Sequence, residues 1–205
     1  MLNSAVLQLH ELTNRPGQHM VSAWWQHLDM QPWQRVYQDT PTSQRAIDRV
    51  LASRRGSSTA ALPNTLNTHE STALALWARL PKILTALGLL RLGRTEYLLL
   101  GPYRRALESS LDEAVCAQVL ALRPSTPPSA FLCASAWLEP EQVLSSALAA
   151  GIRVLDAILP RPAVRAAFDI LWAPDAAGVA EPGLAQDVQT QRFAWGLVTQ
   201  LGRVL

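Results

Sequence analysis

The stretch that decides the fold is LALWARLPKILTALGLLRLG, residues 74–93. Its first part places Leu74, Trp77 and Leu80 at helical spacing, which predicts one buried helix side. Pro81 cannot continue that helix without losing a backbone hydrogen bond. We therefore expect the chain either to kink at Pro81 or to begin a new helix with this proline in its first turn.

The second part of the stretch predicts a helix over Lys82–Leu92 that ends at Gly93. Gly88 lies inside this helix, where glycine costs about 1 kcal/mol relative to alanine. A close approach of another backbone at Gly88 would justify that cost. Leu87 belongs to the apolar side of the same helix.

The composition extends this helical character to the whole chain. The 205 residues include 34 Leu and 30 Ala, which favour helices, but only 5 Ile and 13 Val, which favour strands. The sequence therefore predicts an all-α fold, an irregular compact multi-helix bundle whose helices are separated by prolines. We expect a single helical domain, 1–205, with sub-lobes at 1–62 (N-terminal helices), 66–123 (motif-bearing core) and 129–205 (C-terminal helices).

Capping residues and breakers predict the element boundaries. We expect N-caps at Thr42 or Ser43 and at Thr68, and a capping box from Ser110 to Glu113. The sequence Arg15-Pro16-Gly17 predicts a break, and loops are expected at 54–67, 123–129 and 174–183. The expected helices include about 4–13, one that carries Trp24 and Trp25 and ends before Pro32, 140–159, one around 164–171, and a last one that ends near Leu205.

Charge and motifs exclude several function classes. The net charge is only +2 and acids interleave with the arginines, which disfavours nucleic-acid binding. There is no phosphate-binding glycine motif, no hydrolase elbow and no metal-ligand spacing around the four histidines. We therefore expect no catalytic residue, no cofactor and no metal, with the histidines (His10, His19, His27 and His69) on helix surfaces or in solvent.

The location follows from three further features. Arg79, Lys82 and Arg91 interrupt the most apolar window, so we expect no membrane span. Residues 1–13 have no signal-peptide pattern, and only two cysteines, Cys116 and Cys133, occur in the chain. These features predict a cytoplasmic protein.

Tryptophan and arginine supply the candidate partner contacts. Trp24, Trp25 and Trp33 crowd the N-terminal region, where core packing is the alternative role. Trp24 and Trp25 point about 100° apart on a helix, so we expect one of them to be free for a partner. Arg104 and Arg105 form either a solvated face or a docking site for an acidic partner. Farther along the chain, the spacing of Arg161, Arg165 and Asp169 predicts solvent-exposed charges.

The run WARLPKILTALGLLRL, residues 77–92, resembles a known family. Its Trp-x-Arg-Leu-Pro spacing, followed by Leu-Gly and a further Leu, is similar to that of the SctK-like sorting-platform adaptors of bacterial type III secretion systems. The resemblance covers about residues 74–122.

The resemblance implies a helical, non-catalytic cytoplasmic adaptor at the base of an injectisome, peripheral to the inner membrane. Such an adaptor links the cytoplasmic domain of the inner-membrane ring (SctD-like) protein to the pod (SctQ-like) protein, which carries the export ATPase complex and effectors. The motif residues Trp77, Leu80, Pro81, Leu87 and Gly88 would act through structure. Arg79 and Arg91 would either pair with acids inside the fold or face a partner.

Two other function classes remain as alternatives. A helical secretion chaperone or regulator that binds effector proteins would need an apolar groove or a symmetric dimer interface. An enzyme with an unfamiliar site would need a deep pocket that gathers titratable side chains.

Overall fold

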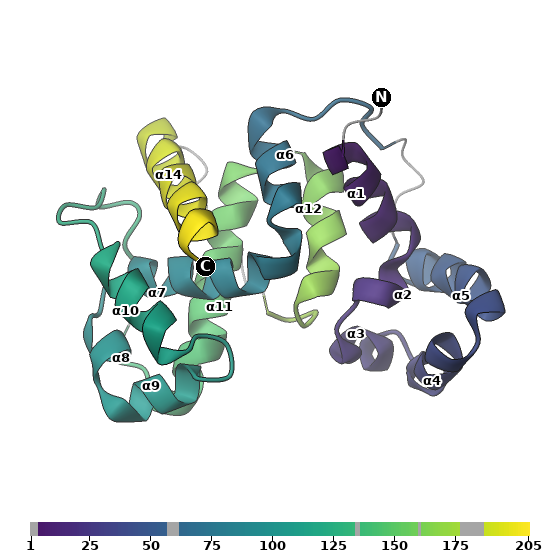
Figure 1. Cartoon of the computed structure of the whole chain (residues 1–205), viewed down its shortest axis with the longest axis horizontal. Helices are drawn as coiled ribbons and strands as arrows, with labels where there is room; N and C mark the ends of the chain where they lie inside the picture. The colour runs from purple at the N-terminus through teal and green to yellow at the C-terminus, as the bar shows by residue number, and fades with distance from the viewer. Residues whose placement is uncertain (1–3, 57–61, 134–135, 160, 177–186) are drawn as a thin grey trace. The chain divides into compact units, whose positions relative to one another are not determined.

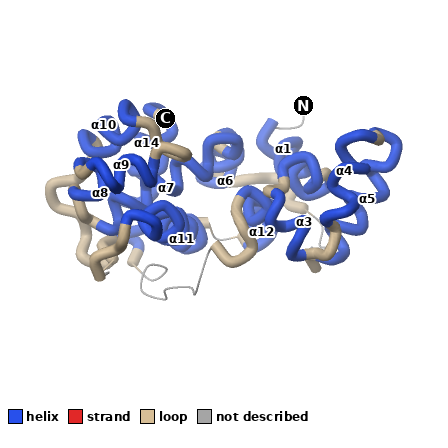
Figure 2. Tube along the Cα trace, turned by 90° about the horizontal axis from the view of Figure 1, so that it is seen from below, coloured by secondary structure: helices blue, strands red, loops and turns tan. Residues whose placement is uncertain are grey.

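The computed structural model describes residues 4–56, 62–133, 136–159, 161–176 and 187–205. Within these residues the chain forms thirteen α-helices and two 3₁₀ helices, and no β-strand (Figures 1 and 2). The prediction of an all-α fold is confirmed. No single helix among the described residues is long and apolar enough to cross a membrane, and only the bent pair 68–75 and 77–92 reaches that length and hydropathy when taken together.

The helices form two compact units, each built from two segments of the chain. The first unit comprises Met1–Trp77 and Arg161–Asp175. Its helices are α1 (Ser4–Asn14), α2 (Pro16–His19), α3 (Ser22–His27), α4 (Gln31–Asp39), α5 (Pro41–Arg54), α6 (Thr68–Ala75), α12 (Pro162–Phe168) and the 3₁₀ helix η2 (Asp169–Leu171).

The second unit comprises Ala78–Pro160 and Ala176–Leu205. Its helices are α7 (Leu80–Leu92), α8 (Glu96–Leu99), α9 (Gly101–Leu107), α10 (Glu113–Ala121), α11 (Pro140–Ile158) and α14 (Val188–Val204), and the 3₁₀ helix η1 (Trp77–Arg79) lies at the unit boundary. The predicted sub-lobes have different limits from these units, because α12 packs on α1 across a long stretch of sequence. The single-domain expectation stays a prediction.

A close crossing of α7 and α11 forms the centre of the second unit. Eleven of the thirteen residues of α7 are buried. A Cβ atom on Gly88 would lie only 1.7 Å from the carbonyl oxygen of Ala147, and one on Gly151 only 2.0 Å from the carbonyl oxygen of Leu84. The expected close backbone approach at Gly88 is confirmed, and a second glycine on α11 makes the same approach in return.

The start and end of α7 follow from its sequence. The helix begins at Leu80 with Pro81 in its first turn, so the chain restarts at the proline as one of the two alternatives predicted. It ends at Gly93, whose φ of 71° lies in the left-handed region that glycine adopts without strain. Leu80 and Leu87 are fully buried, as expected for the motif.

Three N-cap predictions are wrong by one to three residues. Asn67, not Thr68, caps α6, in a reciprocal capping box with Glu70. Asp112, not Ser110, caps α10 by accepting a hydrogen bond from the Val115 amide. The N-cap of α5 is Thr40, which makes no side-chain hydrogen bond there.

Two helices were not predicted in the N-terminal segment. Pro16 begins the short helix α2 where a break was expected, and α4 begins at Gln31 around Pro32. In both cases the proline occupies the first helical turn, where its missing N–H costs nothing. The loops expected at 54–67 and 174–183 fall partly outside the described residues, and the non-helical stretch at 123–129 is confirmed.

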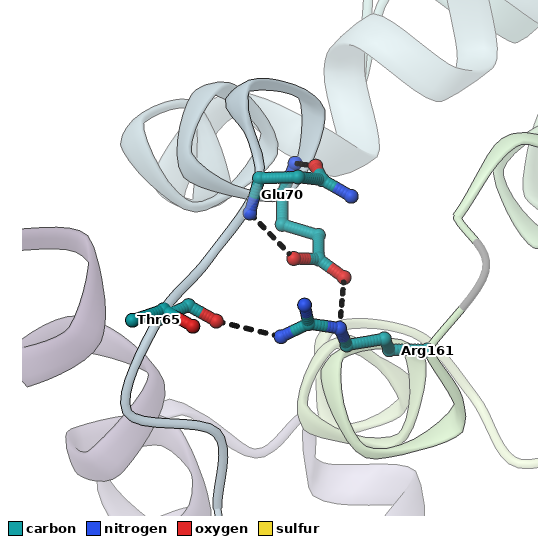
Figure 3. A network of polar contacts seen from close by, with 4 residues as sticks. Thr65, Glu70 and Arg161 are labelled. Atoms are coloured by element: carbon teal, nitrogen blue, oxygen red, sulfur yellow. Dashed lines mark hydrogen bonds and ion pairs between the residues drawn. The ribbon is translucent and has the colours of Figure 1, made fainter.

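A buried ion pair joins the two chain segments of the first unit (Figure 3). The Glu70 side chain has no solvent exposure, and its Oε1 lies 3.2 Å from Nε of Arg161. The other oxygen of Glu70 accepts a hydrogen bond from the Asn67 amide, and Nη1 of Arg161 donates to the carbonyl oxygen of Thr65 at 2.6 Å. Arg161, predicted to be a solvent-exposed charge, keeps 41% of its side chain exposed, but its guanidinium also ties the residue before α12 to the start of α6.

We expect Gly88→Ala to destabilise the protein by about 1–3 kcal/mol or more, because the added methyl group meets the backbone of Ala147 and α11 must move. Gly196→Ala is the matched control, since Gly196 lies in α14 with open space around it. That control should stabilise the protein by about 0.5–1 kcal/mol through helix propensity. Urea unfolding followed by circular dichroism measures both changes, and equal stabilities of the two variants would contradict the close crossing.

Glu70→Gln preserves the shape and capping capacity of the side chain but removes its charge. We expect a loss of about 1–3 kcal/mol in unfolding free energy, below the full cost of breaking a buried pair because Arg161 is partly exposed. Glu113→Gln removes a carboxylate from a more exposed pair with Arg104 and should cost less than Glu70→Gln, because solvent screens this pair. A comparable loss in the two variants would refute a structural role for the Glu70–Arg161 pair.

Candidate interaction surfaces

The seven tryptophans all lie in the described part of the chain, and the structure separates them by exposure. Trp33 is 51% exposed and Trp137 is 47% exposed, one on each unit. The other five are buried or half-buried. Because an exposed tryptophan offers a large apolar area to a partner, Trp33 and Trp137 mark the two candidate interaction surfaces.

The pair Trp24 and Trp25 has a structural role. Trp25 is only 1% exposed and packs against Tyr37, with ring centroids 5.5 Å apart. Trp24 is half-buried, and its indole N–H donates to the carbonyl oxygens of Asp169 and Trp172, each at 2.9 Å. The partner-contact hypothesis is therefore wrong for Trp25, and the polar tip of Trp24 is already used inside the first unit.

A half-open apolar hollow of about 490 Å³ lies beside Trp24 in the first unit. The guanidinium of Arg55 lies 5.2 Å from the Trp24 ring centroid and donates to the carbonyl oxygen of Ala166. Burial lowers the pKa of Arg55, and Asp169 opposes that effect. These contacts bind α3, α5 and α12 together, so the described lining of the hollow is largely structural.

Trp33 lies on α4, which packs against α5 to form a helix pair joined at Thr40. Val36, one turn after Trp33, is also exposed, so the two side chains share one face of α4. On α5, Arg45 and Arg49 are exposed one turn apart, and Val50, the residue after Arg49, is exposed about 100° farther around the helix. We call these five residues the α4–α5 surface.

Trp137 belongs to an aromatic cluster in the second unit that the sequence analysis missed. The guanidinium of Arg94 lies 5.0 Å from the Trp137 ring centroid, and the rings of Tyr97 and Tyr103 lie 5.7 and 6.0 Å from it. The two tyrosine hydroxyls hold the next residue, Leu138, by its backbone: Tyr97 accepts from its amide and Tyr103 donates to its carbonyl. Trp137 is thus a fixed, half-exposed anchor. The residues of this aromatic cluster are far apart in sequence, so no local sequence pattern could have revealed the cluster.

The predicted arginine candidates separate into exposed and internal groups. Arg79 and Arg105 are exposed, and Arg104 is half-exposed and paired with Glu113. The Glu113 carboxylate raises the pKa of Arg104 by accepting its hydrogen bond. Arg91 is only 1% exposed, and its guanidinium donates to the carbonyl oxygens of Phe131 and Ala150. The partner-facing alternative for Arg91 is therefore wrong.

Trp77, predicted as a core anchor, is half-buried in the first unit. Its indole ring makes an edge contact with the ring of His19, with centroids 4.6 Å apart. His19 is therefore not a simple surface residue as predicted. Nε2 of His19 also lies 3.9 Å from a carboxylate oxygen of Glu11.

A buried carboxylate fixes α2 against α5. Asp48 is buried, and its Oδ1 accepts from the Gly17 amide at 3.0 Å while its Oδ2 accepts from the Tyr37 hydroxyl at 3.3 Å. Burial raises the pKa of Asp48 and, with the charge of Asp48, that of Tyr37. Burial lowers the pKa of His19 against the opposing charges of Glu11 and Asp48. These contacts inside the first unit are sufficient to explain the burial of Asp48, Tyr37 and His19.

In the described residues, no group of three or more histidine, cysteine or acidic side chains is arranged to hold a metal ion. Burial raises the pKa of the Cys116 thiol, as expected for a small buried apolar side chain. Cys133 is half-buried.

Comparison with protein families gives one match. The model of a family described as "type III secretion system subunit" matches residues 7–174, which is most of the chain and includes parts of both units. Comparisons with curated proteins and with solved structures gave no match.

The lowered pKa of His19 predicts a pH dependence of stability. Because the folded state favours neutral His19, the unfolded state takes up the proton first as the pH falls below about 6.5. The contribution of His19 to stability should therefore be full above that pH and decline toward its lower folded-state pKa. We expect the difference in unfolding free energy between the parent and His19→Gln to shrink as the pH falls through this window. A difference between the parent and His19→Gln that does not change with pH would contradict this assignment.

Proposed function

Because the chain belongs to a family of type III secretion system subunits, we propose that it is a non-catalytic adaptor of the sorting platform. In this role it links the cytoplasmic domain of the inner-membrane ring protein to the pod protein that carries the ATPase complex and effectors. It acts in the cytoplasm, at the inner face of the inner membrane.

The observation that carries this proposal is the distribution of exposed tryptophans. A bridging protein needs two separate docking surfaces, and Trp33 and Trp137 provide one anchor on each unit. Both anchors are held on rigid neighbours: Trp33 on a helix packed against α5, and Trp137 on Tyr97 and Tyr103. Such preorganised aromatic side chains lose little conformational freedom when a partner covers them.

The family resemblance of residues 77–92 supports the same role through structure. Gly88 permits the α7–α11 crossing at the centre of the second unit, and Leu80 and Leu87 are fully buried in the same helix. The buried residues of the motif therefore maintain the frame that carries Trp137, whereas Arg79 in the same run is exposed. This arrangement agrees with an adaptor in which the motif positions other residues and performs no chemistry.

Affinity capture from cells that express the secretion apparatus tests the proposal. We expect the tagged parent protein to recover both the ring protein and the pod protein. Trp33→Ala and Trp137→Ala should each lose one of the two partners and retain the other, because the anchors lie on different units. The direction and size of the loss are read from the ratio of the two recovered proteins.

Two control variants remove exposed apolar side chains elsewhere: Leu7→Ala on α1 and Val188→Ala on α14. Both should recover the two partners as the parent does. Recovery of secreted substrates without ring or pod protein would refute the adaptor role and favour the secretion-chaperone alternative.

A further inference from the structure

The α4–α5 helix pair carries an excess of exposed positive charge. Residues 31–56 contain five arginines, at positions 35, 45, 49, 54 and 55, but only two acids, Asp39 and Asp48. Asp39 is paired with Arg35, with Nε and Oδ2 3.5 Å apart, and Asp48 is buried. The exposed charge that remains is therefore positive.

Arg45 and Arg49 are the centre of this excess. They lie one turn apart on α5, both exposed, and within the described residues neither forms an ion pair. Arg54 differs from them, because its Nη1 donates to the backbone carbonyl oxygens of Leu28 and Asp29. The guanidinium groups of Arg45 and Arg49 are thus available for a ligand outside the first unit.

A hollow of about 450 Å³ beside Arg45 adds a second chain segment to the surface. Arg15, from the junction of α1 and α2, and Arg45 line it together with Thr42 and Gln44. Asp48 also lines the hollow, and both of its carboxylate oxygens already accept hydrogen bonds, from the Gly17 amide and the Tyr37 hydroxyl. Two arginines that converge on one hollow suit a carboxylate, which a guanidinium binds through two parallel hydrogen bonds.

Apolar exposure accompanies this charge on the same helix pair. Trp33 and Val36 are exposed on one face of α4, and Val50 is exposed on α5 next to Arg49. Tryptophan and arginine are the residue types that dominate binding energy at protein interfaces. A surface that combines them fits a partner with both acidic and apolar side chains.

We propose that the α4–α5 surface docks an acidic amphipathic segment of a partner protein, whose carboxylates meet Arg15, Arg45 and Arg49 while its apolar side chains cover Trp33 and Val36. The charge complementarity selects this occupant. An anionic membrane is the weaker fit, because stable attraction to such a membrane takes a larger cluster of basic residues. This inference deepens the adaptor role and rests on it for the existence of a partner at this surface.

The test uses the purified full chain and two short fluorescent peptides. One carries glutamate and leucine at amphipathic helical spacing, and the other has lysine in place of every glutamate. We expect fluorescence anisotropy to detect binding of the acidic peptide alone. The binding should weaken as salt increases, because screening reduces attraction between exposed charges.

Charge reversal identifies the surface. The double variant Arg45→Glu, Arg49→Glu should weaken binding of the acidic peptide by about tenfold or more. The matched control Arg192→Glu, Arg203→Glu reverses two exposed arginines on α14 in the other unit and should bind as the parent does. Trp33→Ala should weaken binding at low and high salt alike, because its contribution is apolar. Thermal melts of each variant show that it is folded.

Three results would overturn the inference: equal binding of the two peptides, equal binding by the reversed variant and the parent, or binding to phosphatidylserine vesicles with none to the acidic peptide.

Failure of this inference can be distinguished from failure of the adaptor role, because the peptide experiment and the capture experiment have separate results. If the peptide binds as expected but ring and pod proteins are not recovered, the adaptor role fails and the surface stands. If both proteins are recovered but charge reversal has no effect on the peptide, the surface assignment alone fails.

Discussion

The second unit depends on the contact between the backbones of α7 and α11. At Gly88 and Gly151 each helix presents a bare Cα to a carbonyl group of the other, so the two axes come closer than any side chain would allow. Two further helices of the unit pack directly on this pair: α9 packs on α11, and α14 packs on both. The helix α8 packs on α9, and α10 packs on α8. Even the Arg91 guanidinium, which lies inside the unit, is satisfied by a carbonyl oxygen of α11. Close-packed interiors transmit small displacements, so this crossing determines where the surface elements of the unit lie.

The first unit is held by a different kind of interaction. Its helices are shorter, and buried polar groups fix them at points where the chain changes direction. Asp48 binds the backbone of α2, and Glu70 binds both its own helix start and the guanidinium of Arg161. Each of these carboxylates is costly to bury unless its oxygens are satisfied, which favours one arrangement of the short helices over others.

Local features of the fold were predictable from the sequence, and long-range polar contacts were not. The helical class followed from Leu and Ala, and the close approach followed from a glycine inside an apolar helix. Caps were misplaced by one to three residues because several residues that are all favoured at N-caps lie close together, such as Asn67 and Thr68, or Ser110 and Asp112. The internal contacts of Arg91 and the ion pair of Arg161 could not be predicted, because charged residues are normally exposed and the partners of these two are distant in the chain.

The candidate interaction surfaces, too, were only partly predictable from the sequence. Trp33 was selected as a candidate because three tryptophans lie close together in this part of the sequence. Trp24 and Trp25 are half-buried and buried, whereas Trp33 is exposed, and only tertiary packing determines which of the three is exposed. The Trp137 cluster joins α8, α9 and the residue before Leu138, so no sequence window contains it. The sequence showed a family resemblance at residues 77–92. These residues contribute more to the packed interior of the second unit than to its candidate interaction surface.

The central claim is that one copy of this protein engages two components at once through separate surfaces. The mass of the assembly formed from three purified proteins tests it most directly: this chain, the cytoplasmic domain of the ring protein and the pod protein, measured by sedimentation velocity or native mass spectrometry. The account predicts a ternary species that contains all three proteins. Two binary complexes that displace each other, with no ternary species at any ratio, would contradict it.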